Sequence, residues 1–412
     1  MKDKIKVAVI GCGGRGHGMI GTIDDMQEDV QIIGVCDVYQ DRVENAQKRV
    51  EEETGFKPFG STDYHDILAL EGLDSVYIAS DWSTHIRIAI DAMKAGVPAA
   101  MEVGGAYSLE ECWELVDTYE KTGVWAMMME NCCYGDREMM VHNMVRRGVL
   151  GKIVFCSGQY AHDLRGEVSY GTKNRHYRLR NYLSRNCENY PTHELGPIAK
   201  ILEINRGNRM VSMASYCTGS FGLKDYVEKH EDLHEELLGK EFAQADVVKT
   251  IIKTERGEVI ELTLDTTLPR FYSRGFTVRG TKGLYQEDGD IVYLDEEKYR
   301  KHEWSSSNFW GNGKKFQDEF YSDVWKATTE EMMQKGHGGM DWHVLRAWVE
   351  AVKTGTKPPI DVYDAAAWMC ITPLSEISIK NGGQTVEIPD FTRGKYKDRE
   401  PIEDNAYAVI NK

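Results

Sequence analysis

Short apolar runs alternate with helical patterns over the first 130 residues, and this alternation restricts the fold more than any other feature of the chain. The runs span residues 4–10, 30–38, 75–80, 97–103 and 124–130. Residues 41–53 and 109–122 repeat apolar side chains with the helical period, and Ser108 with Glu111 predicts a capping box before the second helix. Such alternation is typical of βαβ units, so we predict an α/β domain with a doubly wound parallel sheet.

The pattern changes after about residue 150. Residues 152–160, 247–254, 259–267 and 276–279 alternate apolar and polar side chains, as strands with one exposed face do, and the turn 255–258 joins two of them. Helical patterns follow at 341–353 and 361–380, and the charged tail 390–412 predicts surface coil. We predict two domains: a Rossmann domain over 1–150, and a substrate-binding α+β domain with a large, mostly antiparallel sheet over 151–412.

A glycine string stands where the first strand should turn into a helix. Gly11 permits a tight turn, Gly13 lets backbone approach a pyrophosphate, and Gly16 allows the helix to lie close to the sheet. Asp37 closes the next strand, where a carboxylate binds the adenosine ribose and repels a 2′-phosphate. The pattern favours NAD over NADP. The alternative is that these residues form only a tight turn and a surface Asp and bind no cofactor. The predicted cofactor residues of this region are Gly11, Gly13, Gly14, Arg15, Gly16 and Asp37.

The composition is that of an ordinary globular protein, with 41% hydrophobic and 28% charged residues. The 66 acidic and 50 basic residues give a formal charge of -16, so we expect neither nucleic acid nor an anionic membrane as a partner. The nine cysteines show no CxxC spacing, which favours a reducing compartment, and no apolar run approaches the ~18 residues of a membrane helix. We expect a cytoplasmic protein, unless an export segment has been removed, and a homo-oligomer formed through the exposed sheet face.

Two further strand ends should face the same cleft as the glycine string, because ligands bind beyond the carboxyl ends of parallel strands. Residues 79–85 include Trp82 and His85, and residues 101–105 include Glu102. Here the chain resembles the sugar oxidoreductase superfamily that includes glucose-fructose oxidoreductase and inositol dehydrogenase. The resemblance implies that Trp82, His85 and Glu102 belong to the cofactor site. Those dehydrogenases usually carry Glu-Lys-Pro, whose Lys assists alcohol oxidation, whereas this chain has Val103 and Gly104 after Glu102.

Sequence blocks over nearly the whole chain narrow the resemblance to glycoside hydrolase family 109, the NAD-dependent family typified by α-N-acetylgalactosaminidase. The blocks lie at residues 130–134, 158–165, 178–180, 190–193, 195–199, 204–207, 271–275, 337–341, 361–365 and 388–394. Among them are Tyr190-Pro-Thr-His193 and Phe271-Tyr272-Ser-Arg274-Gly. The resemblance therefore implies a glycosidase that acts on a small-molecule glycoside and uses NAD.

The same resemblance implies a redox-neutral route to hydrolysis. NAD+ takes hydride from carbon 3 of the sugar, and the resulting ketone acidifies the hydrogen on carbon 2. A base removes that proton, the enolate expels the leaving group from carbon 1, water adds back, and the hydride returns. The anomeric configuration is retained, and the anomer that the enzyme prefers stays open. Such a site needs proton acceptors near carbons 2 and 3 and donors for the developing enolate.

The resemblance also assigns functional importance to particular side chains. His193 is the first candidate for accepting the proton of the carbon 3 hydroxyl. Tyr190 shares that work or polarises the ketone, and Tyr160 is the runner-up for the carbon 2 proton. Arg178 and Glu130 are expected to hold sugar hydroxyls through charge-assisted hydrogen bonds, and Tyr272 to contact the carbon 2 substituent.

Each of these residues also has a structural interpretation. His193 can be a hydrogen-bonding residue of a Pro-flanked turn, Tyr160 a packed strand aromatic and Arg178 a solvated cation. Glu130 would then simply end a helix or strand. For residues 337–341 we favour a flexible loop that opens a helix, with Asp341 as its N-cap, and a contact with cofactor or substrate is the alternative.

Glu194 departs from the family pattern, which usually has Gly after Tyr-Pro-Thr-His. A carboxylate there would raise the pKa of the neighbouring base if close, or bind a substrate hydroxyl if turned inward.

The sequence alone leaves three alternatives to the glycosidase. They are an NAD-dependent sugar dehydrogenase of the same superfamily, a non-catalytic NAD-dependent sensor and a metalloglycosidase. The last is disfavoured because the sequence shows no tight cluster of metal ligands, and we predict no metal.

Overall fold

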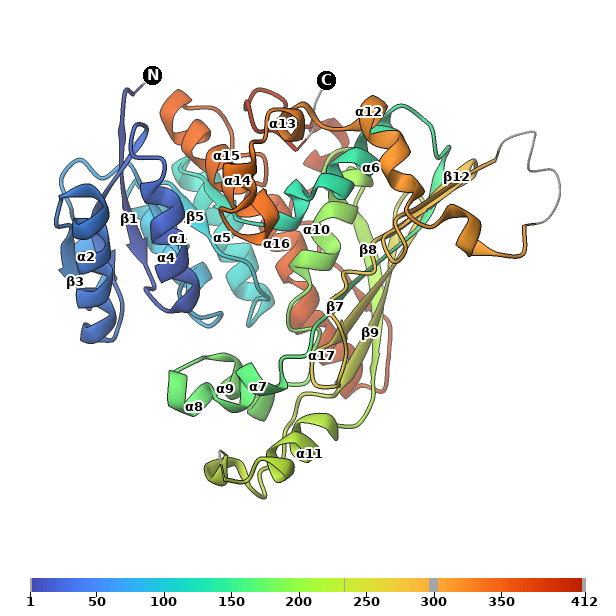
Figure 1. Cartoon of the computed structure of the whole chain (residues 1–412), viewed down its shortest axis with the longest axis horizontal. Helices are drawn as coiled ribbons and strands as arrows, with labels where there is room; N and C mark the ends of the chain where they lie inside the picture. Colours follow the sequence, from blue (N-terminus) through green and yellow to red (C-terminus); the bar gives the residue numbers. More distant parts are fainter. Residues whose placement is uncertain (1, 233, 296–302, 410–412) are drawn as a thin grey trace. The chain divides into compact units, whose positions relative to one another are not determined.

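The computed structural model describes residues 2–232, 234–295 and 303–409 (Figure 1). The chain divides into two compact units. Unit 1 comprises Met1–Gly135, Asp323–Ala366 and Pro401–Lys412, and unit 2 comprises Asp136–Ser322 and Ala367–Glu400. Grouping residues by their contacts places the first boundary between the units after Gly135, and the chain returns to unit 1 at Asp323. The domain boundary expected at residue 150 stays a prediction.

Unit 1 is built on a six-stranded sheet in the order β3-β2-β1-β4-β5-β6, and every pairing in it is parallel. The strands are β1 (Ile5–Ile10), β2 (Val30–Cys36), β3 (Phe59–Ser61), β4 (Ser75–Ile78), β5 (Ala99–Met101) and β6 (Ala126–Met128). Most are fully buried, as strands covered by helices on both faces must be. The predicted parallel α/β domain is confirmed, with strands a few residues shorter than the apolar runs.

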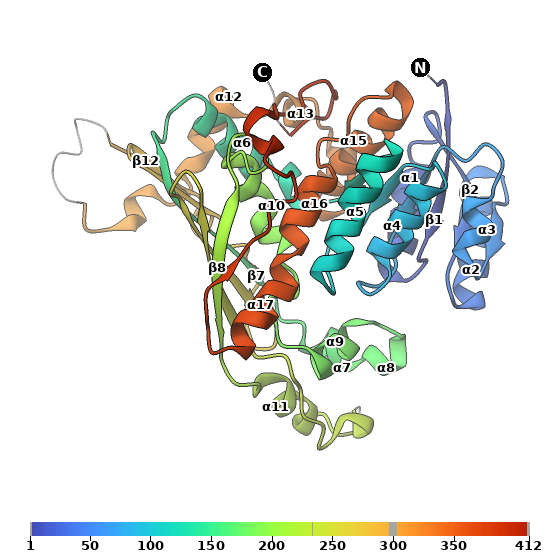
Figure 2. The ribbon, with the colours of Figure 1, turned by 180° about the vertical axis from the view of Figure 1, so that it is seen from behind.

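The helices of unit 1 cover this sheet, with α1 beside α2 and α4 beside α5. Figure 1 views the sheet from the side of α1, and Figure 2 from the side of α4 and α5. The predicted capping box is present, because the Ser108 side chain accepts from the Glu111 N–H and Glu111 reaches back to the Ser108 N–H. The helices are α1 (Gly14–Asp24), α2 (Gln40–Thr54), α3 (Tyr64–Leu68), α4 (His85–Lys94), α5 (Leu109–Thr122), η1 (Asn131–Tyr134), α13 (Asp323–Lys326), α14 (Glu330–Met333), η6 (His337–Gly339) and α15 (Met340–Thr354).

Unit 2 is built on an eight-stranded sheet in the order β13-β12-β11-β7-β10-β9-β8-β14. Its pairings are antiparallel except that of β10 with β7, so the predicted mostly antiparallel sheet is confirmed. The turn at residues 255–258 joins β9 to β10 as expected. The strands are β7 (Ile153–Ala161), β8 (Met210–Cys217), β9 (Val247–Thr254), β10 (Val259–Asp265), β11 (Thr277–Gly280), β12 (Gly283–Gln286), β13 (Ile291–Leu294) and β14 (Val386–Glu387).

Helices α10 and α17 cover one face of this sheet, α10 over β7 and β10 and α17 over β8. The opposite face carries the exposed side chains of Val154, Tyr216 and Ile251. The helices are α6 (Asp136–Arg146), α7 (Arg165–Ser169), α8 (Gly171–Asn174), α9 (Arg178–Ser184), α10 (Thr192–Ile201), α11 (Gly222–Lys229), η2 (Glu235–Leu237), η4 (Ser306–Phe309), η5 (Asn312–Phe316), α12 (Gln317–Phe320), α17 (Ile371–Lys380) and η7 (Lys395–Asp398).

Two expectations about the C-terminal third need correction. Residues 361–380 form two helices, α16 (Val362–Met369) and α17, and not one. Pro373 explains the break, because its ring clashes with the carbonyl of Met369 and it has no N–H to donate. The tail is coil with one added turn, η7, and it buries Phe391 and Tyr396 instead of lying wholly on the surface. Residues 410–412 of that tail lie outside the described part.

No helix within the described residues is both long and apolar enough to span a bilayer.

Substitution of two glycines in α1 tests the close packing of this helix. A Cβ at Gly16 would lie 1.8 Å from the Gly11 carbonyl oxygen, whereas a Cβ at Gly18 would meet nothing within 4 Å. We expect Gly16→Ala to destabilise the protein by about 3 kcal/mol or more, since backbone must move. Gly18→Ala is the matched control and should stabilise it by about 0.5–1 kcal/mol. Denaturant unfolding of both variants checks this, and equal stabilities would contradict the described turn.

Candidate functional site

The turn between β1 and α1 is shaped by the close approach of backbone. Gly11 has φ +93°, and a Cβ there would lie 2.5 Å from the Ala79 carbonyl at the end of β4. Helix α1 begins after Gly13, which offers no side chain to cap the first N–H groups. Gly14 is open on its Cβ side. The first turn of α1 therefore presents N–H donors and the positive end of a helix dipole, as an anion-binding turn requires.

Asp37 is held beside this turn at the end of β2. Its carboxylate accepts hydrogen bonds from the N–H of Cys12 at 2.8 Å and of Tyr39 at 3.0 Å. Arg42 lies 3.8 Å from the same carboxylate. A hollow of about 580 Å³ opens here, lined by Cys12, Gly13, Gly14, His17, Arg42, Asn45, Lys48, Arg49 and Glu52. The combination of an uncapped helix start, a glycine backbone and a fixed carboxylate fits the pyrophosphate and adenosine parts of NAD.

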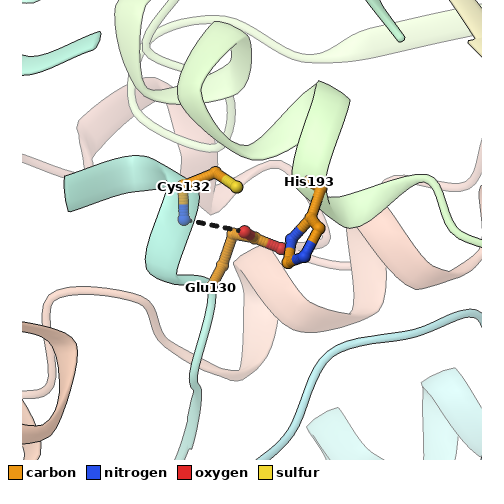
Figure 3. Close-up of side chains that lie close together, drawn as sticks. All are labelled: Glu130, Cys132 and His193. Carbon is orange, nitrogen blue, oxygen red and sulfur yellow. Dashed lines mark hydrogen bonds between the residues drawn. The ribbon is translucent and has the colours of Figure 1, made fainter. Parts of the chain in front are cut away.

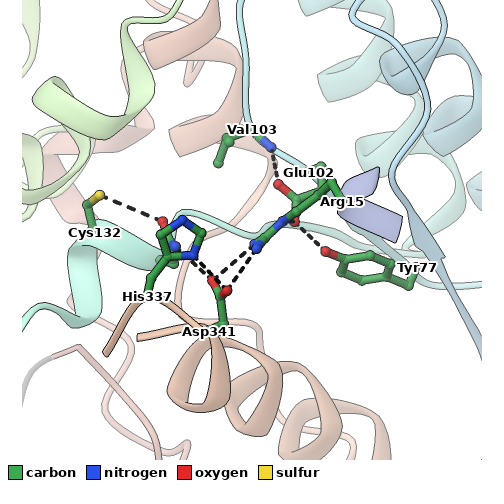
Figure 4. Close-up of polar contacts among 8 residues, drawn as sticks. Arg15, Tyr77, Glu102, Val103, Cys132, His337 and Asp341 are labelled. Atoms are coloured by element: carbon green, nitrogen blue, oxygen red, sulfur yellow. Dashed lines mark hydrogen bonds and ion pairs between the residues drawn. The ribbon is translucent and has the colours of Figure 1, made fainter. Parts of the chain in front are cut away.

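Arg15, two residues into α1, turns its side chain into unit 1 (Figure 4). Its guanidinium donates to Glu102 at 2.8 Å and to both carboxylate oxygens of Asp341, at 2.8 and 3.0 Å. Glu102 also accepts from the Tyr77 hydroxyl and from the Val103 N–H. The structure thus brings together two predicted cofactor residues, Arg15 and Glu102, and both form hydrogen bonds with other groups of the protein.

Asp341 lies at the centre of this network and is not the N-cap of α15. Gly339 occupies that position, and Asp341 sits in the first helical turn, where a carboxylate is favoured by the helix dipole. It also accepts from the Asn131 side chain at 2.7 Å and lies 2.8 Å from His337 Nδ1. The hydrogen bond to Asp341 raises the pKa of His337, and Asp341 keeps a lowered pKa despite its burial because His337 and Arg15 surround it.

Trp82 and His85 belong to the core of unit 1. The Trp82 ring covers Gly104, where a Cβ would lie 2.3 Å from the indole. His85 is fully buried at the start of α4, and burial lowers its pKa to about 4. The lowered pKa favours the neutral imidazole, and the predicted cofactor role of both residues stays a prediction.

Glu130 follows β6 and caps the short helix η1. Its carboxylate accepts from the Cys132 N–H at 3.0 Å, as Figure 3 shows, and the residue is fully buried. The sequence leaves open whether Glu130 binds sugar or ends an element. The structure shows that Glu130 stands at the end of an element, where it caps η1. Its binding of sugar stays a prediction.

In unit 2, the predicted proton-transfer residues form an aromatic cluster. Tyr160 comes from β7, Tyr190 from the loop before α10, and His193 from the first turn of α10. The Tyr160 and Tyr190 rings lie 4.4 Å apart, and the His193 ring lies 5.7 Å from Tyr160 and 4.8 Å from Tyr190. Three side chains that can exchange protons thus share one small region.

Arg178, at the start of α9, places its guanidinium beside this cluster. The guanidinium carbon lies 4.9 Å from the centre of the Tyr190 ring and 5.8 Å from that of Tyr160. Its Nε is 2.9 Å from a carboxylate oxygen of Glu167. Arg178 is only 7% exposed, so the interpretation as a solvated cation is wrong. A guanidinium in this position can stabilise negative charge on nearby oxygens.

Tyr272 and His162 extend the cluster. Their rings meet edge to face at 5.2 Å, and Tyr272 is half-exposed. His162 is not among the residues singled out from the sequence. It directly follows β7, two residues beyond Tyr160, and this spacing is the signal that could have found it, since alternate residues of an extended segment share a face. Burial lowers the pKa of His162, which favours the neutral imidazole.

Glu194 does not turn toward the aromatic cluster. Its side chain is buried, and its carboxylate accepts from the Thr263 N–H of β10 at 2.8 Å. The structure thus shows Glu194 bound to β10, and a contact with a substrate hydroxyl, one of the two possibilities left open by the sequence, stays untested.

The His337–Asp341 contact predicts a titration that can be observed directly. Asp341→Asn should lower the pKa of His337 toward its ordinary value of 6.5, because the charged partner is gone. In the wild-type protein the raised pKa of His337 adds stability below about pH 6.5, which is lost as the pH rises through the raised value. NMR titration of the histidine ring protons measures the change. Asp25→Asn, which removes a partner of Lys335 instead, is the control. An unmoved His337 titration in Asp341→Asn would contradict the contact.

Family models match both parts of the chain. "Glycosyl hydrolase 109, C-terminal domain" matches residues 134–398, and "Oxidoreductase family, NAD-binding Rossmann fold" matches residues 5–130. A "Glycosyl hydrolase family 109 protein" of Stenotrophomonas maltophilia is 37% identical over 97% of this chain and 91% of its own length. An "Alpha-N-acetylgalactosaminidase" of Tannerella forsythia is 35% identical over 96% of this chain and 88% of its own length.

Solved structures show the same fold at low sequence identity. Myo-inositol 2-dehydrogenase of Lactobacillus plantarum matches with a TM-score of 0.65 and 16% identity, covering 94% of this chain and 100% of its own. The WlbA dehydrogenase of Bordetella pertussis, crystallised with NADH and UDP-GlcNAcA, matches with a TM-score of 0.64 and 14% identity, covering 94% of this chain and 99% of its own. The solved structures show the fold, and the family models together with the relatives that align along nearly its whole length show that the chain belongs to glycosyl hydrolase family 109 and carries an NAD-binding Rossmann domain.

Proposed function

We propose that the protein is an NAD-dependent glycosidase that cleaves a terminal sugar with retention, with an N-acetylgalactosaminide as the first candidate substrate. The observation that carries this proposal is the presence, in one chain, of a family 109 domain and a Rossmann domain with an intact glycine turn. The relative named alpha-N-acetylgalactosaminidase, 35% identical, supports the choice of sugar.

Bound NAD supplies a reversible acceptor for the hydride on carbon 3 of the sugar, held through Gly11, Gly13, Gly14 and Asp37. His193 accepts the proton of the carbon 3 hydroxyl, with Tyr190 beside it. Tyr160 accepts the proton of carbon 2. This assignment uses the cluster of unit 2, in which each of the three side chains lies next to the other two.

Arg178 and Tyr272 bind the substrate in this proposal. The Arg178 guanidinium beside Tyr160 and Tyr190 stabilises the enolate that forms when carbon 2 loses its proton. Tyr272, half-exposed at the edge of the cluster, contacts the substituent on carbon 2. Glu130 keeps its predicted role in binding sugar hydroxyls.

The solved structures that share this fold include dehydrogenases such as myo-inositol 2-dehydrogenase, so net oxidation of a sugar is the second candidate function. The two differ in stoichiometry. A panel of chromogenic glycosides with NAD+ should release many equivalents of aglycone per enzyme without accumulating NADH. Steady NADH formation coupled to sugar oxidation would instead show a dehydrogenase.

Hydrolysis in deuterated water tests the chemistry at carbon 2. Loss and return of the carbon 2 proton should leave deuterium at that carbon of the released sugar, as mass spectrometry or NMR would show. A paired-carboxylate glycosidase acts at carbon 1 alone and incorporates none there. Absence of deuterium from carbon 2 in a hydrolysing enzyme would exclude the elimination route.

Substitution of His193 tests its role as a proton acceptor. We expect His193→Ala to lower kcat by about 10²–10⁴-fold, the usual contribution of a positioned acid or base. His142→Ala is the comparison, since His142 is buried in α6 and has no role in the proposal. Circular dichroism should show both variants folded. A His193→Ala variant with wild-type kcat would remove His193 from the mechanism.

The substrate is a small-molecule glycoside in this proposal. A homo-oligomer and a cytoplasmic location stay predictions, which size-exclusion chromatography with light scattering and cell fractionation can check.

A further inference from the structure

The segment that leads into Tyr190 is buried, although it belongs to no helix or strand. Residues 187–190 are all buried, and they connect the end of α9 to the start of α10. A buried backbone without a regular hydrogen-bond pattern needs partners from other parts of the chain, because unpaired N–H and C=O groups are costly. The groups that supply these partners therefore decide where Tyr190 and His193 stand.

One side of this segment is held by the side chain of Gln244. Its NH₂ group donates to the Cys187 carbonyl at 3.0 Å, and its amide oxygen accepts from the Asn189 side chain at 3.0 Å and from the Cys187 N–H at 3.5 Å. Gln244 is only 2% exposed and lies in residues 241–246, a described stretch that is also neither helix nor strand. A single side-chain amide thus supplies the donor and acceptor that a neighbouring strand would supply in a sheet.

The other side of the segment is held by α17. The Glu188 N–H donates to Ser375 Oγ at 2.8 Å, and Thr372 Oγ1 donates to the Glu188 carbonyl at 2.6 Å. Together with Gln244, these two hydroxyls provide partners for both backbone groups of Cys187 and of Glu188. The segment is therefore fixed from two directions by polar side chains.

The backbone of Gln244 makes a further connection, to α9. Its N–H donates at 3.0 Å to the carbonyl of Tyr182, one of the last four of this helix, which have no partner within it. Arg178 begins the same helix, and its guanidinium carbon lies 4.9 Å from the centre of the Tyr190 ring. Gln244 thus links the helix that carries Arg178 to the segment that carries Tyr190.

We propose that Gln244 is a positioning residue that holds Tyr190 against Arg178, through its side-chain amide on one side and its N–H on the other. An apolar side chain of similar length would take away the partners of both Cys187 backbone groups, and the segment would have to move to find others. Gln244 acts through Tyr190 and Arg178, so its effect on catalysis rests on the proposed function, in which these two residues face the sugar.

Gln244→Met tests the positioning, because it keeps the approximate length of the side chain and removes its hydrogen bonds. We expect kcat for the glycoside to fall by about 10- to 100-fold with KM changed only a few-fold, since a displacement of about 1 Å in an active site costs this much. Gln286→Met, at an exposed position of β12, is the matched control and should keep the wild-type kcat. A residue that only stabilised the fold would leave kcat per folded enzyme unchanged, so wild-type kcat in folded Gln244→Met would overturn the proposal.

Gln244→Glu tests the hydrogen bond to the Cys187 carbonyl through pH. An ionised carboxylate keeps the acceptor contacts but has no hydrogen to donate, whereas a protonated carboxyl can donate to that carbonyl. The kcat of this variant relative to wild type should therefore recover as the pH falls from about 9 to 5, because protonation restores the donor and burial raises the pKa of the introduced carboxyl group. Gln244→Met should show no recovery. If Gln244→Met does not fold, this comparison still decides the proposal, and a deficit that stays constant over the pH range would overturn it.

A measurement without substrate separates this proposal from the proposed function. The His193 ring lies edge to face with the Tyr190 ring at 4.8 Å, so its NMR signals depend on where Tyr190 stands. We expect Gln244→Met to shift the His193 ring signals, which are identified by their loss in His193→Ala, and Gln286→Met to leave them in place. A wild-type protein without glycosidase activity would refute the proposed function, whereas His193 signals that do not move in Gln244→Met would overturn the positioning role.

Discussion

The partly buried guanidinium of Arg15 neutralises two buried carboxylates, and this pairing joins distant parts of unit 1. Glu102 follows β5 and Asp341 opens α15, so one guanidinium joins the first βα turn to a segment more than 300 residues away. The pairing is bidentate to Asp341, the geometry in which guanidinium and carboxylate interact most strongly. Leaving either charge without its partner inside a protein is strongly destabilising, so this network constrains the whole cofactor end of the sheet.

Unit 2 also buries charged side chains, but their contacts differ from those in unit 1. Its buried cation, Arg178, lies against aromatic rings and Glu167, and its two buried acids, Glu188 and Glu194, accept the backbone N–H groups of Tyr190 and Thr263. Both arrangements surround the segment with Tyr190 and His193. Tyrosine and histidine rings at 4.4–5.7 Å keep fixed orientations only when the backbone that carries them is held firmly, and β7, β10 and α17 provide that hold.

The sequence is most informative where local rules decide the structure. The helix after Ser108 has the predicted limits because its cap is local, and the turn at Gly11 follows from a motif of six residues. Contacts between distant residues cannot be predicted in this way. Nothing near Arg15 in the sequence points to Asp341, and the short strands β12–β14 gain their partners from the sheet. A carboxylate at a helix start usually is a cap, and the prediction for Asp341 is wrong because a distant cation binds it instead. His162 has a local signal in the sequence, the two-residue period of a strand.

The return of Asp323–Ala366 to unit 1 has a consequence for biosynthesis. While the ribosome is still making unit 2, all six strands of the parallel sheet already exist but α15 does not, so Arg15 has Glu102 as a partner and not yet Asp341. Until the later segment emerges, the guanidinium has only one of its two carboxylate partners. A fragment that stops at residue 135 or 150 would lack the second carboxylate, because the segment that supplies it follows unit 2 in the sequence.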